Sequence, residues 1–289
     1  MTIEQSKRQA ALSLWKSQGS PLTELWRALS EAVQSPFYPI YERFLTAAAE
    51  TWKKPQHIGI IMDGNRRFAK KLGASDVAFG HQMGADKLRE MLDWCFERNI
   101  PVVTVWGFSL DNFQRDSQEV QQLFELFERK TLEMVTSPDL HDNNVRVRFI
   151  GRRDLLPESL QEAIRKVEHA TAHYERFVLN IALAYGGREE ITDAFKDYLN
   201  HAQKTGKSLD AVIEDFNPKS LERYLYTSGL PEPDLIIRTS GEVRLSGFML
   251  WQSANSEYYF CDTHWPAFRK IDFLRALRSY DQRQRRFGR

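Results

Sequence analysis

Short apolar runs alternate with helix-length segments over most of this chain, and this alternation constrains its fold more than any other feature. Five runs have the length and composition of buried strands: 57–62, 102–106, 145–150, 177–183 and 235–237. The intervening segments 84–98, 117–135, 157–172 and 188–202 have the length of helices. Near-continuous apolar strands that alternate with helices are typical of a parallel sheet covered on both faces. The pattern therefore predicts an α/β fold.

Residues 1–54 differ in character from the rest of the chain. Apolar residues recur there at helical spacing on both sides of Pro36, which predicts two short amphipathic helices, one on each side. Two roles stay open for them: packing on the main domain or a partner subunit, or contact of an aromatic-rich face with a membrane surface. The segment 55–289 contains no internal repeat, low-complexity segment or convincing linker, so we expect it to form one domain.

The charge balance excludes a general affinity for nucleic acid. The chain has 40 Lys and Arg residues and 39 Asp and Glu residues, so an anion site must be built locally. Its two cysteines, Cys95 and Cys261, stand far apart in apolar surroundings, as expected of free thiols in a reducing cytoplasm. No apolar run approaches the ~20 residues that span a bilayer, and the polar N-terminus lacks signal-peptide features. We expect a cytoplasmic protein that is not integral to a membrane.

The polar segment after the first apolar run is the first candidate site. It contains Asp63, Gly64, Asn65, Arg66 and Arg67. In a parallel sheet, ligands bind beyond the carboxyl ends of the strands. N–H groups at a helix start, together with two arginines, would bind an anion. An acidic residue fits there if a divalent cation links it to a bound phosphate. The same residues also fit a helix cap followed by a solvated basic face.

Two later segments also follow predicted strands. The segment 107–115 contains Ser109, Asp111, Asn112 and Arg115, which form a polar site or a simple turn. The segment 238–246 combines Arg238, Arg244 and three hydroxyl side chains around one glycine. Arginine forks match phosphate oxygens, and backbone near a glycine can approach a ligand closely. This third segment predicts a diphosphate site from its residues alone.

Together these segments resemble the cis-prenyltransferase family, which includes undecaprenyl, decaprenyl and short-chain Z-prenyl diphosphate synthases. The resemblance extends from about residue 56 to residue 289. It is most specific in HIGIIMDGNRR (57–67) and DLIIRTSGE (234–242), and it continues through RLS (244–246), SEYYF (256–260) and WP (265–266). The resemblance implies a single domain with a mainly parallel six-stranded sheet, surrounding helices and a hydrophobic tunnel, assembled as a homodimer.

The resemblance also implies roles for individual residues. Asp63 would bind Mg²⁺ together with an allylic diphosphate, and Glu257 would complete the metal site from the partner subunit. Residues 64–67 and His81 would bind the allylic diphosphate; Arg238, Arg244 and Ser246 would bind isopentenyl diphosphate. Ser109, Asn112 and Arg115 would lie between the two substrates. Arg286 and Gly288, in the C-terminal Arg-Phe-Gly, would cross the dimer interface.

The implied reaction is Z chain elongation of an allylic diphosphate, with geranyl or farnesyl diphosphate as the expected starter. Asn112 is the nominal proton acceptor, but an amide is a very weak base. We expect Asn112 to orient groups while a diphosphate oxygen or a relayed water takes the proton. Gly107 matches a tunnel position where a bulky residue favours short products, whereas the likeness to short-chain enzymes argues the other way. Product length therefore stays open.

The chain departs from the family pattern near the allylic site. Arg66 stands where glycine is common, and Val77 stands where an arginine is usual, so Arg66 is expected to compensate for that missing cation. Phe68 and Phe113 replace frequent tryptophans and keep an aromatic surface next to the substrates.

Two rival functions predict different sequence features. A non-catalytic partner subunit would lack the Asp63-type residue or the 238–246 segment, and both are intact. A trans-prenyltransferase is wholly helical and needs two aspartate-rich motifs, whereas this chain contains no adjacent Asp-Asp pair.

Overall fold

The structure is a computed structural model that describes residues 38–74 and 76–283. The chain divides into two compact units, residues 1–51 and 52–289. In the first unit the described helix is α3 (Tyr38–Ala48), which coincides with the second of the two predicted amphipathic helices. The first predicted helix, before Pro36, lies outside the described residues.

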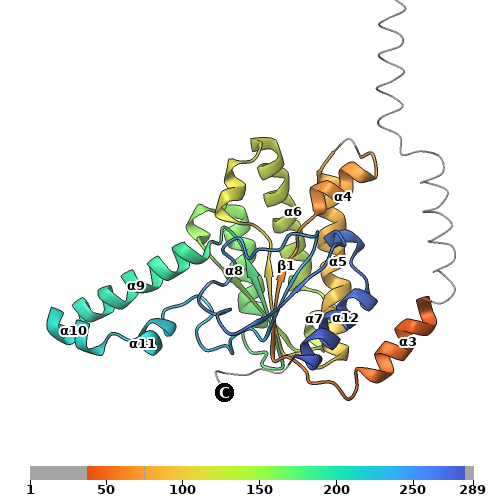
Figure 1. Cartoon of the computed structure of the whole chain (residues 1–289). Coiled ribbons are helices and arrows are strands. Elements are labelled where there is room, and N and C mark those ends of the chain that lie inside the picture. Colours follow the sequence, from red (N-terminus) through yellow and green to blue (C-terminus); the bar gives the residue numbers. More distant parts are fainter. Residues whose placement is uncertain (1–37, 75, 284–289) are drawn as a thin grey trace, which may run out of the picture. The chain divides into compact units, whose positions relative to one another are not determined.

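The second unit contains a six-stranded sheet in which every neighbouring pair is parallel. The strand order is β3-β4-β2-β1-β5-β6 (Figure 1). The strands are β1 (His57–Ile61), β2 (Val102–Trp106), β3 (Val145–Ile150), β4 (Phe177–Ala182), β5 (Leu235–Arg238) and β6 (Glu257–Phe260). Ile61 pairs with Trp106 and with Arg238, so the loops after β1, β2 and β5 leave the sheet side by side. The predicted fold class is confirmed.

Helices and short 3-10 turns connect the strands. The helices of the second unit are α4 (Asn65–Lys71), α5 (Ala78–Glu97), α6 (Ser117–Val135), α7 (Pro138–Asp142), α8 (Glu158–Thr171), α9 (Gly187–Lys204), α10 (Leu209–Asp215), α11 (Pro218–Glu222) and α12 (Lys270–Gln282). The turns are η1 (Leu110–Gln114), η2 (Arg153–Leu155) and η3 (Trp265–Ala267).

Helix α5 begins six residues before its predicted start at residue 84. The glycines at 80 and 84 suggest a boundary, because glycine lowers helix stability. Here they are needed for a close approach: a Cβ on Gly84 would lie 2.6 Å from Oδ1 of Asn65, and one on Gly80 would lie 2.2 Å from its carbonyl oxygen. Tertiary packing of the start of α4 on α5 therefore overrides the local preference.

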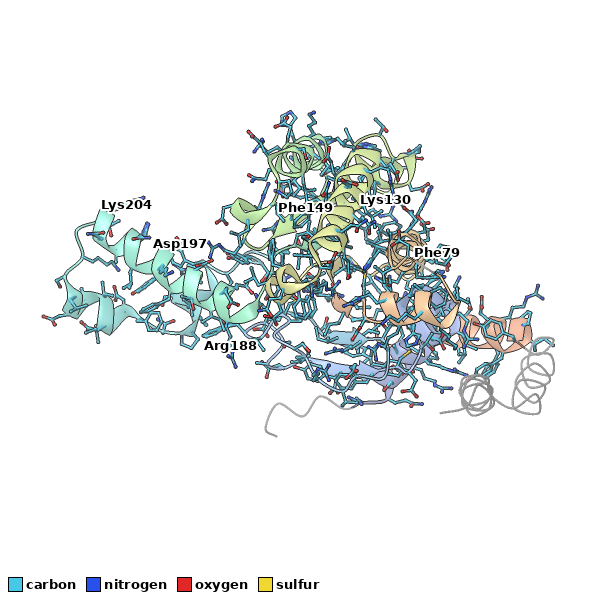
Figure 2. The ribbon with its side chains drawn as sticks, turned by 90° about the horizontal axis from the view of Figure 1, so that it is seen from above. Phe79, Lys130, Phe149, Arg188, Asp197 and Lys204 are labelled. Atoms are coloured by element: carbon cyan, nitrogen blue, oxygen red, sulfur yellow. The ribbon has the colours of Figure 1, made fainter. Side chains whose placement is uncertain are left out.

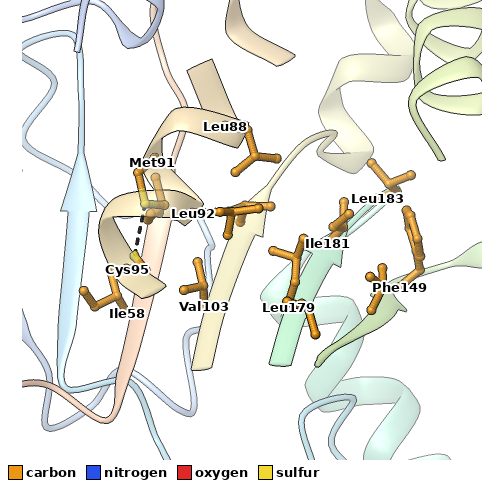
Figure 3. Packing of buried hydrophobic residues seen from close by; sticks show 14 of the residues in the cluster. Ile58, Leu88, Met91, Leu92, Cys95, Val103, Phe149, Leu179, Ile181 and Leu183 are labelled. Carbon is orange, nitrogen blue, oxygen red and sulfur yellow. Dashed lines mark hydrogen bonds between the residues drawn. The ribbon is translucent and has the colours of Figure 1, made fainter. Parts of the chain in front are cut away.

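The main hydrophobic core lies on one face of the sheet. Figure 3 shows Met91 and Cys95 of α5 near Ile58 of β1, with Leu179 and Ile181 of β4 further along the sheet. Helices α6, α8 and α12 also contribute buried side chains to this core. On the other face, a second cluster includes Phe248 and Met249 from the loop between β5 and β6.

Helices α9, α10 and α11 form an arm that extends away from the sheet (Figure 1). Small buried clusters join its helices, including Tyr198 of α9 and Val212 of α10. Several large apolar side chains of the arm are nevertheless exposed, among them Leu209 and Ile213, at 69% and 66%. We refer to residues 187–222 as the arm. Among residues 38–74 and 76–283, no helix is both long and apolar enough to cross a membrane.

Candidate active site

A cavity of about 1120 Å³ extends from the carboxyl edge of the sheet into the space between α5 and α6. One end is lined by the polar loops that follow β1, β2 and β5. Further in, the lining is mainly apolar and includes Leu88, Leu92, Leu123, Phe149 and Leu183; several of these are shown in Figure 3. Binding cavities for small molecules usually measure ~300–1,000 Å³. This cavity therefore suits a ligand with one strongly polar end and a long apolar part.

Asp63 lies at the polar end, directly after β1. Its Oδ1 accepts a hydrogen bond from Nη2 of Arg67 (3.1 Å), and its Oδ2 accepts one from Nη2 of Arg238 (2.9 Å). The backbone carbonyl of Asp63 accepts a bond from the Thr239 hydroxyl (2.7 Å), which ties the β1 and β5 loops together. One carboxylate thus joins the two arginine-containing segments that the sequence singles out.

Gly64 allows the chain to turn from β1 into α4. Its φ of 109° lies in the left-handed region, where a side chain would be strained. A Cβ at this position would also lie 2.9 Å from Nδ1 of His264. Arg66 and Arg67 follow in the first turn of α4, and both line the cavity. The predicted arrangement of Gly64, Asn65, Arg66 and Arg67 at the carboxyl end of a strand is therefore present.

Arg238 is the most deeply placed cation of the site. It ends β5, is 4% exposed, and donates to the Ser246 hydroxyl (2.8 Å) and to the backbone carbonyl of Arg244. These bonds fold the segment 239–246 back over the end of β5. Its buried guanidinium is balanced by Asp63, which suits the role of a fixed positive charge next to an anion.

The loop after β2 is held by its own asparagine. Oδ1 of Asn112 accepts the backbone N–H of Ser109 (3.0 Å), and the Asn112 N–H donates to the Ser109 carbonyl (3.1 Å). The amide oxygen of Asn112 is therefore already used to shape the loop. Ser109, Asp111, Asn112 and Arg115 all line the cavity.

Glu119, on the first turn of α6, contacts three basic residues on this side of the site. Its carboxylate contacts Nε2 of His81 (3.2 Å), Nη1 of Arg115 (3.0 Å) and Nε of Arg66 (3.6 Å). Burial lowers the pKa of His81, although the bond with Glu119 opposes that shift. Sequence reasoning missed Glu119. Arg115 precedes α6 in extended backbone, so helical spacing did not signal this contact.

Several predicted site residues lie away from the cavity. Of the described residues that line it, none is Phe68, Phe113, Arg244 or Glu257. The Phe113 ring packs on Phe108 instead, with 5.0 Å between ring centroids, and Arg244 is exposed and paired with Glu242 at 2.5 Å. Phe68 is half-buried on α4. Arg286 and Gly288 lie outside the described residues.

Glu257 lies at the far side of the sheet from Asp63. It begins β6 opposite Leu235, whereas Asp63 follows the strand end that pairs with Arg238. Three residues of strand separate these levels, roughly 10 Å. Glu257 is instead paired with Arg283 at 2.7 Å. Within one chain, Glu257 therefore does not reach the carboxylate of Asp63.

The site offers few oxygen ligands for a metal. Among the described residues, no group of three or more His, Cys, Asp or Glu side chains could hold a metal ion. Mg²⁺ is nevertheless commonly bound by one or two carboxylates while substrate phosphates and water supply the other oxygens. Asp63 at the cavity, next to cations that would bind those phosphates, fits that mode of binding.

The arrangement defines a class of protein. Arginines from α4 and β5 surround one carboxylate, and a long apolar cavity begins at that point. Such a site can bind a phosphorylated head group and bury an attached hydrocarbon chain.

Comparisons with known proteins are consistent with this class. The family model for undecaprenyl diphosphate synthase matches residues 61–288. An isoprenyl transferase from Thermus thermophilus is 52% identical over 258 residues, which cover 89% of this chain and 98% of that protein. A tritrans,polycis-undecaprenyl-diphosphate synthase (geranylgeranyl-diphosphate specific) from Pyrococcus abyssi is 48% identical, over 88% of this chain and 94% of that protein.

A solved structure shares the fold. Lavandulyl diphosphate synthase from Lavandula x intermedia, in complex with dimethylallyl diphosphate, superposes with a TM-score of 0.75. It is 35% identical and is matched over 82% of this chain and 99% of its own. The chain belongs to the undecaprenyl diphosphate synthase family of cis-prenyltransferases. The expected family is confirmed.

Proposed function

We propose that this enzyme extends geranyl or farnesyl diphosphate with isopentenyl diphosphate to give a Z-polyprenyl diphosphate. The observation that carries the proposal is the junction of the arginine cluster around Asp63 with the apolar cavity. The cluster matches the charge of the diphosphates, and the cavity matches the hydrocarbon of a growing chain. Gly107 lines the cavity and leaves room there, which favours a medium or long product.

The two diphosphates are assigned to opposite sides of Asp63. Residues 64–67 and His81 bind the allylic diphosphate, supported by their position along the cavity. Arg238, Arg244 and Ser246 bind isopentenyl diphosphate. Arg244 serves through its backbone, which Arg238 holds in place, while its exposed side chain is paired with Glu242. Ser109, Asp111, Asn112 and Arg115 lie between the substrates, while Phe68 and Phe113 support the site through packing.

Mg²⁺ is the proposed cofactor, held by Asp63, and it would neutralise charge on the departing diphosphate. The arginines of the chain would neutralise the same negative charge from fixed positions. Arg66 and Arg67 face that diphosphate from α4, while Arg238 is held by Asp63 and Ser246. Preorganised cations stabilise charge that develops as the allylic C–O bond breaks. The apolar lining keeps water from the allylic cation.

Asn112 orients the loop and does not take the proton. Its amide oxygen already accepts a hydrogen bond from the Ser109 N–H, and an amide is a much weaker base than a diphosphate oxygen. A diphosphate oxygen is therefore the proposed proton acceptor. Asn112→Asp should keep that bond but place a negative charge beside two diphosphates. We expect a lower kcat without a new ionisation in the pH–rate profile. A new ionisation in the pH–rate profile of Asn112→Asp would contradict this assignment, and normal turnover with an unchanged profile would count against any direct role for the amide.

A second copy of the chain is proposed to complete the site. Glu257 cannot reach Asp63 of its own chain, so it acts as a metal ligand across a homodimer interface. The exposed apolar side chains of the arm favour such an interface. Arg286 and Gly288 are assigned to the same interface, where they support the partner's diphosphate site.

Residues 55–289 are proposed as the catalytic domain and residues 1–54 as an accessory extension. Helix α3 exposes Ile40 and Phe44, at 65% and 66%, one turn apart. This face supports peripheral contact with a membrane surface at the cytoplasmic side. Co-sedimentation with anionic vesicles tests this, and equal binding by an Ile40→Ser/Phe44→Ser variant would contradict it.

Incubation with labelled isopentenyl diphosphate and Mg²⁺ tests the proposed function. Geranyl and farnesyl diphosphate are offered in turn, with geranylgeranyl diphosphate as a third starter because the Pyrococcus relative is named for it. Chromatography of the dephosphorylated products gives starter preference and chain length together. We expect incorporation with geranyl or farnesyl diphosphate. Absence of incorporation with every starter would favour a non-catalytic partner subunit.

A further inference from the structure

A row of polar side chains bridges α5 and α6 along the outside of the cavity. Nζ of Lys130 lies 3.1 Å from Oδ1 of Asp86, and Nη2 of Arg129 donates to Oε1 of Gln82 at 2.5 Å. We call these four residues the α5–α6 seam. Figure 2 labels Lys130 on α6. Gln82 also donates to Asp86 (3.0 Å), so the two bridges form one connected network.

The seam is a wall of the cavity as well as part of the surface. Asp86 and Lys130 are among the residues that line the cavity. Their side chains are nevertheless 51% and 26% exposed. The wall at this point is therefore one layer of side chains thick. Below it, an ion pair between Arg89 and Asp139 continues the bridge from α5 to α7, and both residues also line the cavity.

The opposite wall has a different composition. It is formed by residues such as Val105, Phe149 and Ile181, which belong to the packed core of the sheet. Separating closely packed apolar side chains is costly, because their contacts are lost outright. Exposed ion pairs contribute little to stability and readily exchange with water. The side chains of the seam therefore separate at a lower free-energy cost than those of the opposite wall.

Both partners of the central pair carry their charges at neutral pH. Burial alone would raise the pKa of Asp86, but hydrogen bonds from Gln82 and Lys130 bring it below its ordinary value. Burial would likewise lower the pKa of Lys130, and its bonds with Glu133 and Asp86 raise it instead. A charged wall is a poor surface for a hydrocarbon tail, so a closed seam confines the tail to the apolar lining.

We propose that the α5–α6 seam determines product length. While the seam is closed, elongation stops when the tail fills the cavity; where the seam separates, the tail passes between α5 and α6 and elongation continues. Lys130 and Asp86 are then specificity-determining residues for the proposed chain elongation, on which this inference rests.

Charge reversal and re-pairing test the seam. Lys130→Asp places a third carboxylate beside Asp86 and Glu133, so the two helices repel at this point. We expect products longer by at least one isoprene unit, measured with detergent present to accept the tail. The double variant Asp86→Lys/Lys130→Asp restores an opposite-charge pair and should return the products to wild-type length. The rate of the first condensation should not change in either variant, because neither Asp86 nor Lys130 is among the residues assigned to the diphosphates.

The control removes an exposed ion pair that does not line the cavity. Arg165 of α8 pairs with Glu162 at 2.8 Å, so Arg165→Ala should leave product length unchanged. Thermal unfolding checks that each variant is folded. If Lys130→Asp does not fold, Lys130→Ala replaces it as the variant that removes the ion pair with Asp86. Active seam variants with unchanged or shorter products overturn the inference. An inactive wild-type enzyme overturns the proposed function instead, so the two failures are distinct.

Discussion

Glu119 is a buried carboxylate that contacts three basic side chains of the site. Its oxygens lie within 3.6 Å of His81, Arg115 and Arg66. Two of these residues extend from other helices, so Glu119 fixes their positions relative to one another. It touches no reacting atom, which makes it a positioning residue.

Replacing Glu119 by Gln should therefore weaken the use of the allylic substrate. A hydrogen bond between charged groups contributes about 1.5–3 kcal/mol, so kcat/KM for the allylic diphosphate should fall about 10- to 100-fold. The KM for isopentenyl diphosphate should change little, because Arg238 and Ser246 lie on the other side of the site. Steady-state kinetics with each substrate varied in turn measures both.

A matched control lies on the same helix. Glu125 is exposed and is bonded to Gln121, so Glu125→Gln should behave like the wild type. Equal losses for both substrates in Glu119→Gln would indicate a general structural defect and contradict the positioning role.

Individual residues were predictable where they follow a strand directly. Asp63, Arg67 and Arg238 meet because β1 and β5 are neighbours in the sheet. The burial of Glu119 was not predictable in this way. Its place depends on how α5 and α6 approach each other, and local sequence carries no information on that distance.

At the scale of the elements, a buried polar chain crosses β1, β2 and β4. His57 is bonded through Nδ1 to the Pro231 carbonyl (2.7 Å) and through Nε2 to the Thr104 hydroxyl (2.7 Å). Asn180 donates to the same hydroxyl at 3.1 Å. Burial lowers the pKa of His57 from its ordinary 6.5 to about 4, so the folded protein keeps this ring neutral.

This neutral histidine should make stability fall in mild acid. Its pKa is lower in the folded state than in the unfolded state, so its contribution is complete above pH 6.5 and is lost as pH falls toward 4. The full loss is about 3 kcal/mol, since one pKa unit corresponds to about 1.4 kcal/mol. Denaturant unfolding of the wild type and His57→Gln between pH 7 and pH 4 measures it as the difference in slope.

His169 provides the comparison, because it is exposed on α8. His169→Gln should keep the wild-type slope, whereas His57→Gln should show a smaller one. Parallel slopes for the wild type and His57→Gln would contradict the assignment.

The elements also show what periodicity could and could not predict. Four strands were predictable because their residues are almost continuously apolar, and β3 because its first apolar residues alternate with Arg146 and Arg148. β6 was not, because all four of its residues are half-buried at the edge of the sheet, where tyrosines are tolerated. The start of α5 was predicted too late because two glycines suggested a boundary, whereas in the structure they allow a close contact with Asn65. In both cases the deciding factor is a neighbour distant in sequence.

At the scale of the whole molecule, the arm and Glu257 bear on the proposed assembly. Ile213 is 66% exposed on α10, so Ile213→Glu should leave the isolated chain folded. It should weaken a dimer that buries this side chain, because a charge would then be desolvated. Light scattering across a dilution series should show dissociation at higher concentrations than for the wild type.

Activity should fall along with dimer content, since each site would lose the glutamate of its partner. Arg165→Glu, on α8 outside the arm, should leave both assembly and activity unchanged. A monomeric Ile213→Glu enzyme with full activity would contradict the shared site, even if the wild type is a dimer.

The turnover of an Asp63→Asn enzyme tests the central claim, that Asp63 organises the two diphosphates and the metal at the mouth of the cavity. Asparagine keeps the shape, but it lacks the charge that binds a cation, and its amide NH2 cannot accept the hydrogen bond that the second carboxylate oxygen accepts from Arg67 or Arg238. Removing one preorganised electrostatic group typically costs about 10²–10³-fold in kcat, and we predict a loss of at least this size at saturating substrates and Mg²⁺. Turnover near that of the wild type would contradict the account.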